Sequence, residues 1–247
     1  MKKSLKVSII ALVFAVAFSF YAETAPKRLI VGVTADYSPF VYIERGKIVG
    51  FDIDLIKRIT KHLNYEVKIK DMEFEDLFSA LKNKEIDVAI SAISVTKKRK
   101  KQVYFSSKYY FPRFTMLSNR DSRIDSISKL KGKIVAAVSG TIMENFLVTK
   151  FAPGKQIKIK IFTNRNHMLN ALLKGKIDAS LTEDGWAKTR AKIYKNLSYI
   201  IIDTPPSKGY AIAFQKNSSL IDGFNDEIVE IKASAQLRKL KKKWGLI

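Results

Sequence analysis

The sequence predicts an α/β protein built from two similar lobes, each a mixed sheet flanked by helices. Short β-branched runs alternate with amphipathic segments from residue 28 onward, and this alternation indicates strands joined by helices. The chain also echoes itself: LKNKEIDVAIS (81–91) is similar to LKGKIDASLT (173–182), with Asp87 and Asp178 in matching positions. The length of 247 residues fits one large domain or two small lobes, and the echo favours two lobes.

The N-terminal segment predicts a secretory signal peptide. Three lysines precede an apolar run from residue 9 to residue 20, which is shorter than the roughly 20 apolar residues that span a bilayer. Residues 1–25 therefore form the expected signal, with cleavage after Ser19, Ala22 or Ala25, and a retained anchor is the alternative. The chain has no cysteine, so a lipid-modified cysteine is excluded and we expect a periplasmic protein.

The first half predicts three strands and two helices in alternation. The helix that opens at Gly50 places Leu55, Ile56, Ile59 and Leu63 on one face. The expected order is the strand RLIVGV, the turn DYSPF, the helix GFDIDLIKRITKHL, the strand YEVKIK, the helix DLFSALKNK and the strand IDVAIS.

The second half repeats this alternation with the strand KIVAAVS, the helix TIMENFLVTK and the strand IDASLT. The last segment predicts a strand, YAIAF, and one long helix with apolar residues from Leu220 to Trp244. No linker rich in proline or glycine occurs, so we expect ordinary strands to cross between the lobes as a hinge. The predicted division is a first lobe of residues 26–113 and 209–247 and a second lobe of residues 114–208.

The net charge of +22 could attract nucleic acid or an anionic membrane. An exported protein rarely meets nucleic acid, however, and the lysines are spread along every segment. We therefore expect a solubilising coat and no nucleic-acid partner. His62 and His167 are isolated in the sequence, and no phosphate-binding or dinucleotide-binding glycine motif occurs. The sequence thus predicts no metal site and no cofactor.

Polar side chains stand where the predicted strands end. Open α/β sheets bind ligands outside the carboxyl ends of their strands. One half offers Ser91 and Ser94, and the other offers Thr141, in a glycine turn that opens a helix, and the pair Glu183 and Asp184. A carboxylate prefers a planar guanidinium fork and an ammonium group prefers an anion. Hydroxyls with a nearby arginine on one side and carboxylates on the other are typical of a site for a zwitterion.

The run TKKRKK (96–101) raises the question of which cation would bind such a ligand. Thr96 is a candidate helix cap, which places Arg99 in the first turn, where its side chain can return toward the strand end. Lysine is a point charge and forks poorly. We expect Arg99 to face inward and the lysines to be solvated; the alternative is that all five cations lie on the surface.

Several motifs together resemble the family-3 solute-binding proteins, which are the periplasmic amino-acid receptors of ABC importers. The resemblance runs from about Leu29 to Gly245, with the elements in family order. It rests on GFDIDLIKRITKHL, ADYSPF, SVTKKRKKQVYFSSKYY, VSGTIMENF, IDASLTED and LRKLKKKWG.

This resemblance implies a type II periplasmic-binding-protein fold, with two lobes that close on one amino acid about two hinge strands. By position, Arg99 and the backbone of Ser94 would hold the α-carboxylate, with help from the backbone N–H of Ile142 after the Gly-Thr141 turn. Glu183 would hold the α-ammonium group. The remaining implied site residues are Tyr37 and Phe74, which would flank the ligand side chain, and Thr34, Ser91, Ala92 and Val138, which would line the rest.

Three departures from the family pattern bear on the ligand. Ile142 and Ala92 lack hydroxyls found in relatives, and Thr34 stands where several receptors for basic amino acids have an acid. Asp36, Glu73, Glu75 and Asp184 remain candidates for binding a cationic side chain. The resemblance implies a polar or basic ligand.

The expected function is a monomeric receptor that delivers this amino-acid ligand to an inner-membrane ABC permease. One alternative is an enzyme, because the cyclohexadienyl dehydratases resemble these receptors. Their general acid would stand at Trp186, which cannot act as one. A second alternative is an adhesin or nucleic-acid binder that acts through the lysines, and it predicts steep salt dependence.

Overall fold

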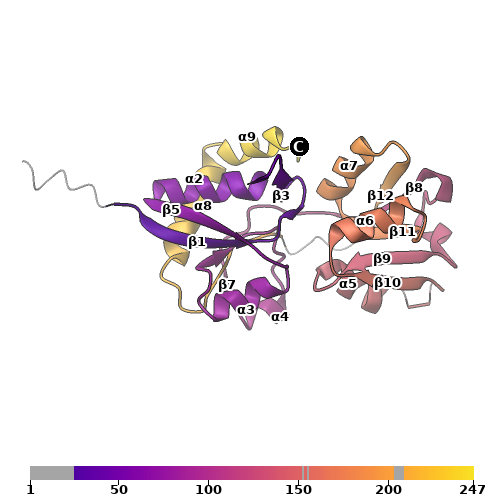
Figure 1. The fold of residues 1–247 in the computed structure, drawn as a ribbon, viewed down its shortest axis with the longest axis horizontal. Helices are drawn as coiled ribbons and strands as arrows, with labels where there is room; N and C mark the ends of the chain where they lie inside the picture. Colours follow the sequence, from indigo (N-terminus) through magenta and orange to yellow (C-terminus); the bar gives the residue numbers. More distant parts are fainter. Residues whose placement is uncertain (1–24, 152, 155, 203–208) are drawn as a thin grey trace, which may run out of the picture.

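The computed structural model describes residues 25–151, 153–154, 156–202 and 209–247. The predicted signal peptide therefore lies almost wholly outside the described residues. Two α/β bodies lie side by side, with β1, α2 and α8 in one and β9, β10 and α6 in the other (Figure 1). We call them the first lobe and the second lobe. None of the described helices is both long and apolar enough to cross a membrane.

The first lobe has a five-stranded sheet in the order β5-β1-β6-β13-β7, with β13 and β7 antiparallel to their neighbours. Apolar clusters cover both faces, one with α2 and α8 and the other with α3. The elements are β1 (Lys27–Val33), α2 (Phe51–His62), β5 (Tyr65–Asp71), α3 (Asp76–Lys82), β6 (Val88–Ala89), α4 (Lys97–Lys100), β7 (Tyr104–Phe105), β13 (Ala213–Phe214), α8 (Ile221–Ala233) and α9 (Gln236–Lys243), with a small sheet of β2 (Asp36–Tyr37), β3 (Val41–Glu44) and β4 (Lys47–Val49).

The second lobe has a five-stranded sheet in the order β10-β9-β11-β8-β12, with β8 antiparallel to both of its neighbours. Its elements are β8 (Phe114–Asn119), the 3₁₀ turns η1 (Arg120–Ser122) and η2 (Ile127–Leu130), β9 (Ile134–Val138), α5 (Ile142–Phe146), the π-helical turn η3 (Leu147–Phe151), β10 (Lys158–Phe162), α6 (Arg165–Leu173), β11 (Ala179–Glu183), α7 (Asp184–Ile193) and β12 (Leu197–Ile201).

The two sheets match position by position, which confirms the predicted α/β fold with two mixed sheets. The echoed aspartates have the same role in each. Asp87 accepts a hydrogen bond from the backbone N–H of Ile30 at 2.7 Å, and Asp178 accepts one from the N–H of Ile134 at 2.8 Å. Each carboxylate thereby joins the strand that follows it (β6 or β11) to the first parallel strand of its own sheet (β1 or β9).

Two segments connect the lobes. One runs through Tyr109 and Tyr110 into β8, and the other returns toward Tyr210 after residues 203–208, which lie outside the described part. The N–H of Tyr210 donates to the carbonyl of Tyr110 at 2.7 Å, and the N–H of Tyr109 donates to the carbonyl of Tyr210 at 2.9 Å. The crossings are therefore paired with each other where they enter the first lobe.

The prediction of one long C-terminal helix is wrong. The segment forms α8 and α9, separated at Ser234 and Ala235, and Ala235 has a left-handed φ of +57°. The periodic pattern of apolar residues is kept across the break, because both helices pack on α2. A side chain at a left-handed position is unfavourable for helix continuation, and the turn redirects α9 along the top of the first lobe (Figure 1).

Candidate ligand-binding site

Arg99 faces inward, as predicted, and the neighbouring lysines are solvated. Arg99 is 8% exposed, whereas the four lysines beside it are exposed: Lys97, Lys98, Lys100 and Lys101. Thr96 caps α4, and its hydroxyl accepts a hydrogen bond from the Arg99 N–H at 3.1 Å. The capped turn directs the arginine side chain back toward the end of the preceding strand, where Nη1 donates to the Ser94 carbonyl at 2.7 Å.

The Arg99 guanidinium is held by both lobes. Nη2 donates to the carbonyl of Gly140, in the turn before α5, at 2.9 Å. Its central carbon lies 5.0 Å from the ring centroid of Phe74 and 5.2 Å from that of Phe78. Burial lowers the pKa of Arg99 to about 10, and the carboxylate of Glu183 opposes this shift. Arg99 therefore remains a cation at neutral pH, and it is electrostatically coupled to Glu183 across the lobes.

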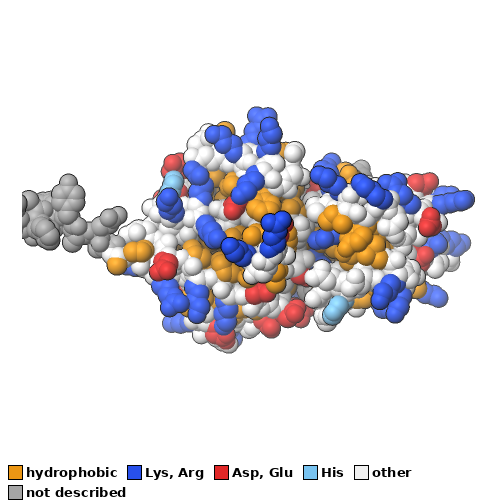
Figure 2. Space-filling view, turned by 45° about the horizontal axis from the view of Figure 1, so that its top comes forward, with side chains coloured by type: hydrophobic (Ala, Val, Ile, Leu, Met, Phe, Trp, Pro, Cys, Tyr) orange, Lys and Arg blue, Asp and Glu red, His pale blue; other side chains and the backbone are white. Residues whose placement is uncertain are grey.

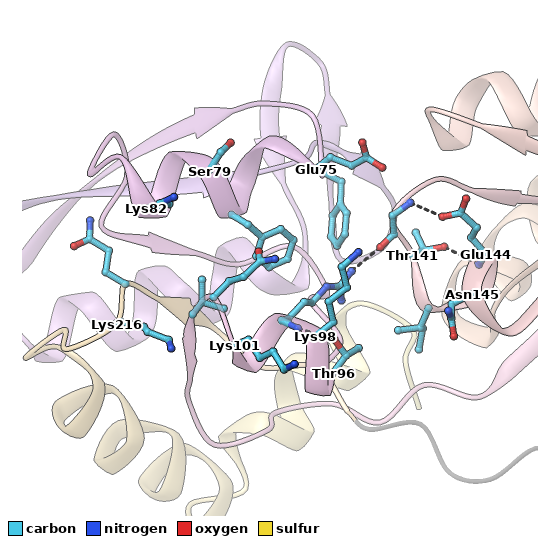
Figure 3. A pocket seen from close by; sticks show the side chains of 18 of the residues that line it. Glu75, Ser79, Lys82, Thr96, Lys98, Lys101, Thr141, Glu144, Asn145 and Lys216 are labelled. Carbon is cyan, nitrogen blue, oxygen red and sulfur yellow. Dashed lines mark hydrogen bonds between the residues drawn. The ribbon is translucent and has the colours of Figure 1, made fainter. Parts of the chain in front are cut away.

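A groove of about 1430 Å³ opens on one side of Arg99. Figure 3 shows Ser79, Lys82 and Glu75 on the first lobe and Thr141, Glu144 and Asn145 on the second lobe around this space. Four of the predicted site residues line the groove: Phe74, Arg99, Thr141 and Ile142. The other seven are not among its lining residues: Thr34, Tyr37, Ser91, Ala92, Ser94, Val138 and Glu183.

Glu183 lies at the end of β11 and is 3% exposed. It is electrostatically coupled to Tyr37 and Tyr210, whose hydroxyls are 3.2 Å apart. Burial raises the pKa of both tyrosines, and Glu183 raises it further. Glu183 thus lies in a buried cluster with phenol groups of the first lobe.

Arg165 is a site residue that the sequence reasoning missed. It stands in the first turn of α6 and is 5% exposed. Its guanidinium carbon lies 4.0 Å from the ring centroid of Tyr37, and Nη1 donates to Asp36 at 3.2 Å. Burial alone would lower the pKa of Arg165, but Asp36 and Glu183 raise it above its ordinary value. A polar run, TNRNH, surrounds it in the sequence, and nothing in that run separates an inward arginine from a solvated one.

Backbone support holds the strand ends in place. The hydroxyl of Ser91 accepts from the N–H of Thr34 at 3.1 Å and thus joins the ends of β1 and β6. Ala92 has a left-handed φ of +48°, and its N–H donates to the buried carboxylate of Asp52 at 2.6 Å. Burial raises the pKa of Asp52 to about 7. Thr34 Oγ1 is buried and has no hydrogen-bond partner among the described residues.

The turn before α5 completes the second-lobe side. Gly140 has a φ of +71°, and the hydroxyl of Thr141 accepts from the Glu144 N–H at 3.2 Å and donates to the Val138 carbonyl at 2.6 Å. The Thr141 hydroxyl is therefore committed to the helix cap. Ile142 begins α5, where a backbone N–H has no acceptor within the helix.

The acidic candidates are mostly engaged elsewhere. Both oxygens of Asp36 accept from Arg165, at 3.0 Å from the backbone N–H and at 3.2 Å from Nη1. Asp184 accepts from the side chain of Arg113 at 3.1 Å. Glu75 is exposed and accepts from the Ser139 hydroxyl at 2.8 Å, and Glu73 is exposed.

One group of described residues has metal-ligand chemistry, and it lies on α2 and α8 rather than in the buried cluster around Glu183. His62 Nδ1 is 2.9 Å from Glu227, and the ligand atoms of His62, Glu227 and Glu230 lie within 4.8 Å of one another. The expectation that His62 is isolated is therefore wrong, because packing of α2 on α8 brings it to two carboxylates distant in sequence. His167 is exposed on α6.

The cationic side chains form no single patch on the face drawn in Figure 2. Lysine and arginine side chains are scattered there over both lobes, with acidic side chains between them. This face therefore carries no concentrated cationic surface.

Comparison with known proteins identifies the family. Residues 29–247 match the model of the bacterial extracellular solute-binding proteins, family 3. The arginine-binding extracellular protein ArtP of Bacillus subtilis (strain 168) is 37% identical over 225 residues, which are 90% of this chain and 88% of that protein.

Solved structures agree. The substrate-binding protein of an amino acid ABC transporter has a TM-score of 0.81 and 36% identity, over 88% of this chain and 98% of that chain. An ancestral arginine-binding protein bound to glutamine has a TM-score of 0.80 and 35% identity, over 88% and 97% of the two chains. This chain is a solute-binding receptor and not an enzyme, so the dehydratase alternative is set aside. It belongs to the bacterial extracellular solute-binding proteins, family 3.

Proposed function

We propose that the protein binds one amino acid between its lobes, with Arg99 on the α-carboxylate and Glu183 on the α-ammonium group. The observation that carries this proposal is that each lobe buries one of two opposite charges: Arg99, 8% exposed and hydrogen-bonded to Gly140 of the other lobe, and Glu183, 3% exposed at the end of β11. An amino-acid backbone presents a carboxylate and an ammonium group a few bonds apart, so it complements such a pair. Micromolar affinity corresponds to about 8 kcal/mol of binding free energy.

Lobe closure is the proposed signal to the transporter. Contacts that join the lobes in this structure include Arg99 with Gly140, Glu75 with Ser139, and Asp36 with Arg165. A ligand that adds contacts to both lobes shifts an open ensemble toward this closed form. An inner-membrane ABC permease would then recognise the closed shape.

The wider proposal concerns the ligand class and the cell compartment. The ligand is polar or basic, in keeping with the arginine-binding and glutamine-bound relatives. The protein acts as a monomer in the periplasm, after residues 1–25 are removed and without a lipid anchor. The first lobe comprises residues 26–113 and 209–247, and the second lobe comprises residues 114–208.

A thermal-shift screen with the twenty amino acids, cystine and ornithine tests this function. A ligand at one hundred times its Kd stabilises the folded state by about 2.7 kcal/mol, so the ligand should raise the Tm by several degrees. Calorimetry on Arg99→Met should then show no binding, whereas Lys98→Met, the same change on the solvated neighbour, should bind normally. Unchanged affinity in Arg99→Met would refute the assigned role, and no response to any amino acid would refute the function.

A further inference from the structure

The interlobe pair of Asp36 and Arg165 lies beside the proposed ligand. Asp36 belongs to β2 of the first lobe, and Arg165 opens α6 of the second. The side chain of Arg165 is 7% exposed and that of Asp36 is 12% exposed. The guanidinium also lies over Tyr37 at 4.0 Å and is electrostatically coupled to Glu183. The pair is therefore part of the same buried cluster as the proposed ammonium site.

Four charged side chains of this cluster sum to zero, since Arg99 and Arg165 are positive and Asp36 and Glu183 are negative. The adjacent Asp184 is also buried, and Arg113 pairs with it at 3.1 Å. A zwitterion with an uncharged side chain leaves this balance unchanged. A cationic side chain would add a buried positive charge with no free carboxylate to meet it, because Arg165 occupies both oxygens of Asp36. Uncompensated buried charges are strongly unfavourable.

Hydrogen-bonding capacity favours an acceptor on the ligand. A guanidinium carries five N–H donors, and among the described residues the Arg165 side chain makes one hydrogen bond, to Asp36. Thr34 Oγ1, two residues before Asp36, is buried and lacks a partner in the described part of the chain. A carboxamide offers an oxygen to the guanidinium and an N–H₂ group to a hydroxyl, and it does so without adding charge.

We propose that Arg165 determines ligand specificity, and that the receptor takes an amino acid with a carboxamide side chain, of which glutamine is the probe, and rejects arginine and lysine. This inference rests on the proposed function. It narrows the ligand class from polar or basic to neutral and polar. It also assigns Asp36 to holding Arg165 rather than to binding a cationic ligand.

Calorimetry with L-glutamine and L-arginine on the purified full chain tests the inference. The wild-type protein should bind glutamine at least about tenfold more tightly than arginine, a difference of about 1.4 kcal/mol. Arg165→Gln frees Asp36 and makes the cluster negative, so arginine affinity should rise about tenfold or more while glutamine affinity falls. Asp36→Asn combined with Arg165→Gln should abolish the gain for arginine.

The controls separate this inference from loss of fold and from failure of the proposed function. Lys133→Gln removes another second-lobe cation that pairs with an aspartate, at 3.3 Å from Asp178, and it should leave the affinity ratio unchanged. Arg165→Lys keeps the charge, so it should keep the rejection of arginine even if Arg165→Gln does not fold. Tighter binding of arginine or of an apolar amino acid by the wild type would overturn the inference, as would an unchanged ratio in Arg165→Gln. Failure to bind any amino acid would instead overturn the proposed function.

Discussion

Asp52 has a carboxylate in a fully buried position, and its removal should change how stability depends on pH. Burial raises its pKa from 3.8 to about 7, and the N–H of Ala92 is its backbone donor. Below pH 3.8 the carboxyl group is protonated in both the folded and the unfolded state, so its burial as a charge costs no stability. Between pH 3.8 and about 7 the group ionises in the unfolded state but not in the folded state, so the loss of unfolding free energy grows with pH. Above about pH 7 this loss is constant.

Asp52→Asn keeps an oxygen acceptor for Ala92 and removes the ionisation. Moving a carboxyl pKa from 3.8 to about 7 is worth about 4 kcal/mol, so the variant should gain up to this amount over the wild type above pH 7. The gain should shrink toward zero at pH 4. Urea denaturation of both proteins at several pH values measures the difference. Parallel stability curves would refute the reasoning. Asp52→Ala also removes the ionisation but leaves the Ala92 N–H unpaired, which costs about 1–3 kcal/mol, so it should be less stable than Asp52→Asn at every pH.

Three further predictions concern the cap of α4, lobe closure and the two aspartates that join strands. Thr96→Ala removes the cap of α4 and should lower the free energy of unfolding by about 1 kcal/mol. It should also weaken ligand affinity measured by calorimetry, because the capped turn directs Arg99. A loss of stability with unchanged affinity would contradict this. Gly185→Val should prevent lobe closure, because a Cβ there would lie 3.1 Å from Phe40 and 3.2 Å from Leu246. Small-angle scattering should therefore show an open form even when ligand is present. The control Gly223→Val, whose Cβ has its nearest neighbour at 3.4 Å, should close normally. Asp87→Ala and Asp178→Ala should each lower the free energy of unfolding by about 1–3 kcal/mol in urea denaturation, and a large effect from only one would argue against equivalent roles.

Much of the fold could be predicted because its signals are local or repeated. The apolar face of α2 and the echo around Asp87 and Asp178 are both visible in the sequence, and the structure gives each the expected place. The break between α8 and α9 was missed, because alanine is a good helix former and the apolar period continues past Ala235, which adopts a left-handed conformation.

The candidate site also contains one residue that the sequence could predict and one that it could not. Arg99 could be singled out because a cap, a strand end and a fork-shaped cation coincide within a few residues. Arg165 could not, since its partners Asp36 and Tyr37 lie far away in the sequence and meet it only when the lobes come together. Asp36 looked like a free acid for the same reason. Sequence signals thus identify groups that one lobe positions alone, and they miss groups that pair across lobes.

The central claim is that one amino-acid backbone bridges Arg99 and Glu183. Calorimetry should compare the identified ligand with its analogue lacking the α-amino group, in the wild type and in Glu183→Gln. The wild type should lose about a hundredfold or more in affinity when the ammonium is absent, since breaking a buried charge pair costs about 2–5 kcal/mol. Glu183→Gln should lose less than about tenfold for the same change. Equal losses in both proteins would contradict the account, because the ammonium would then have another partner.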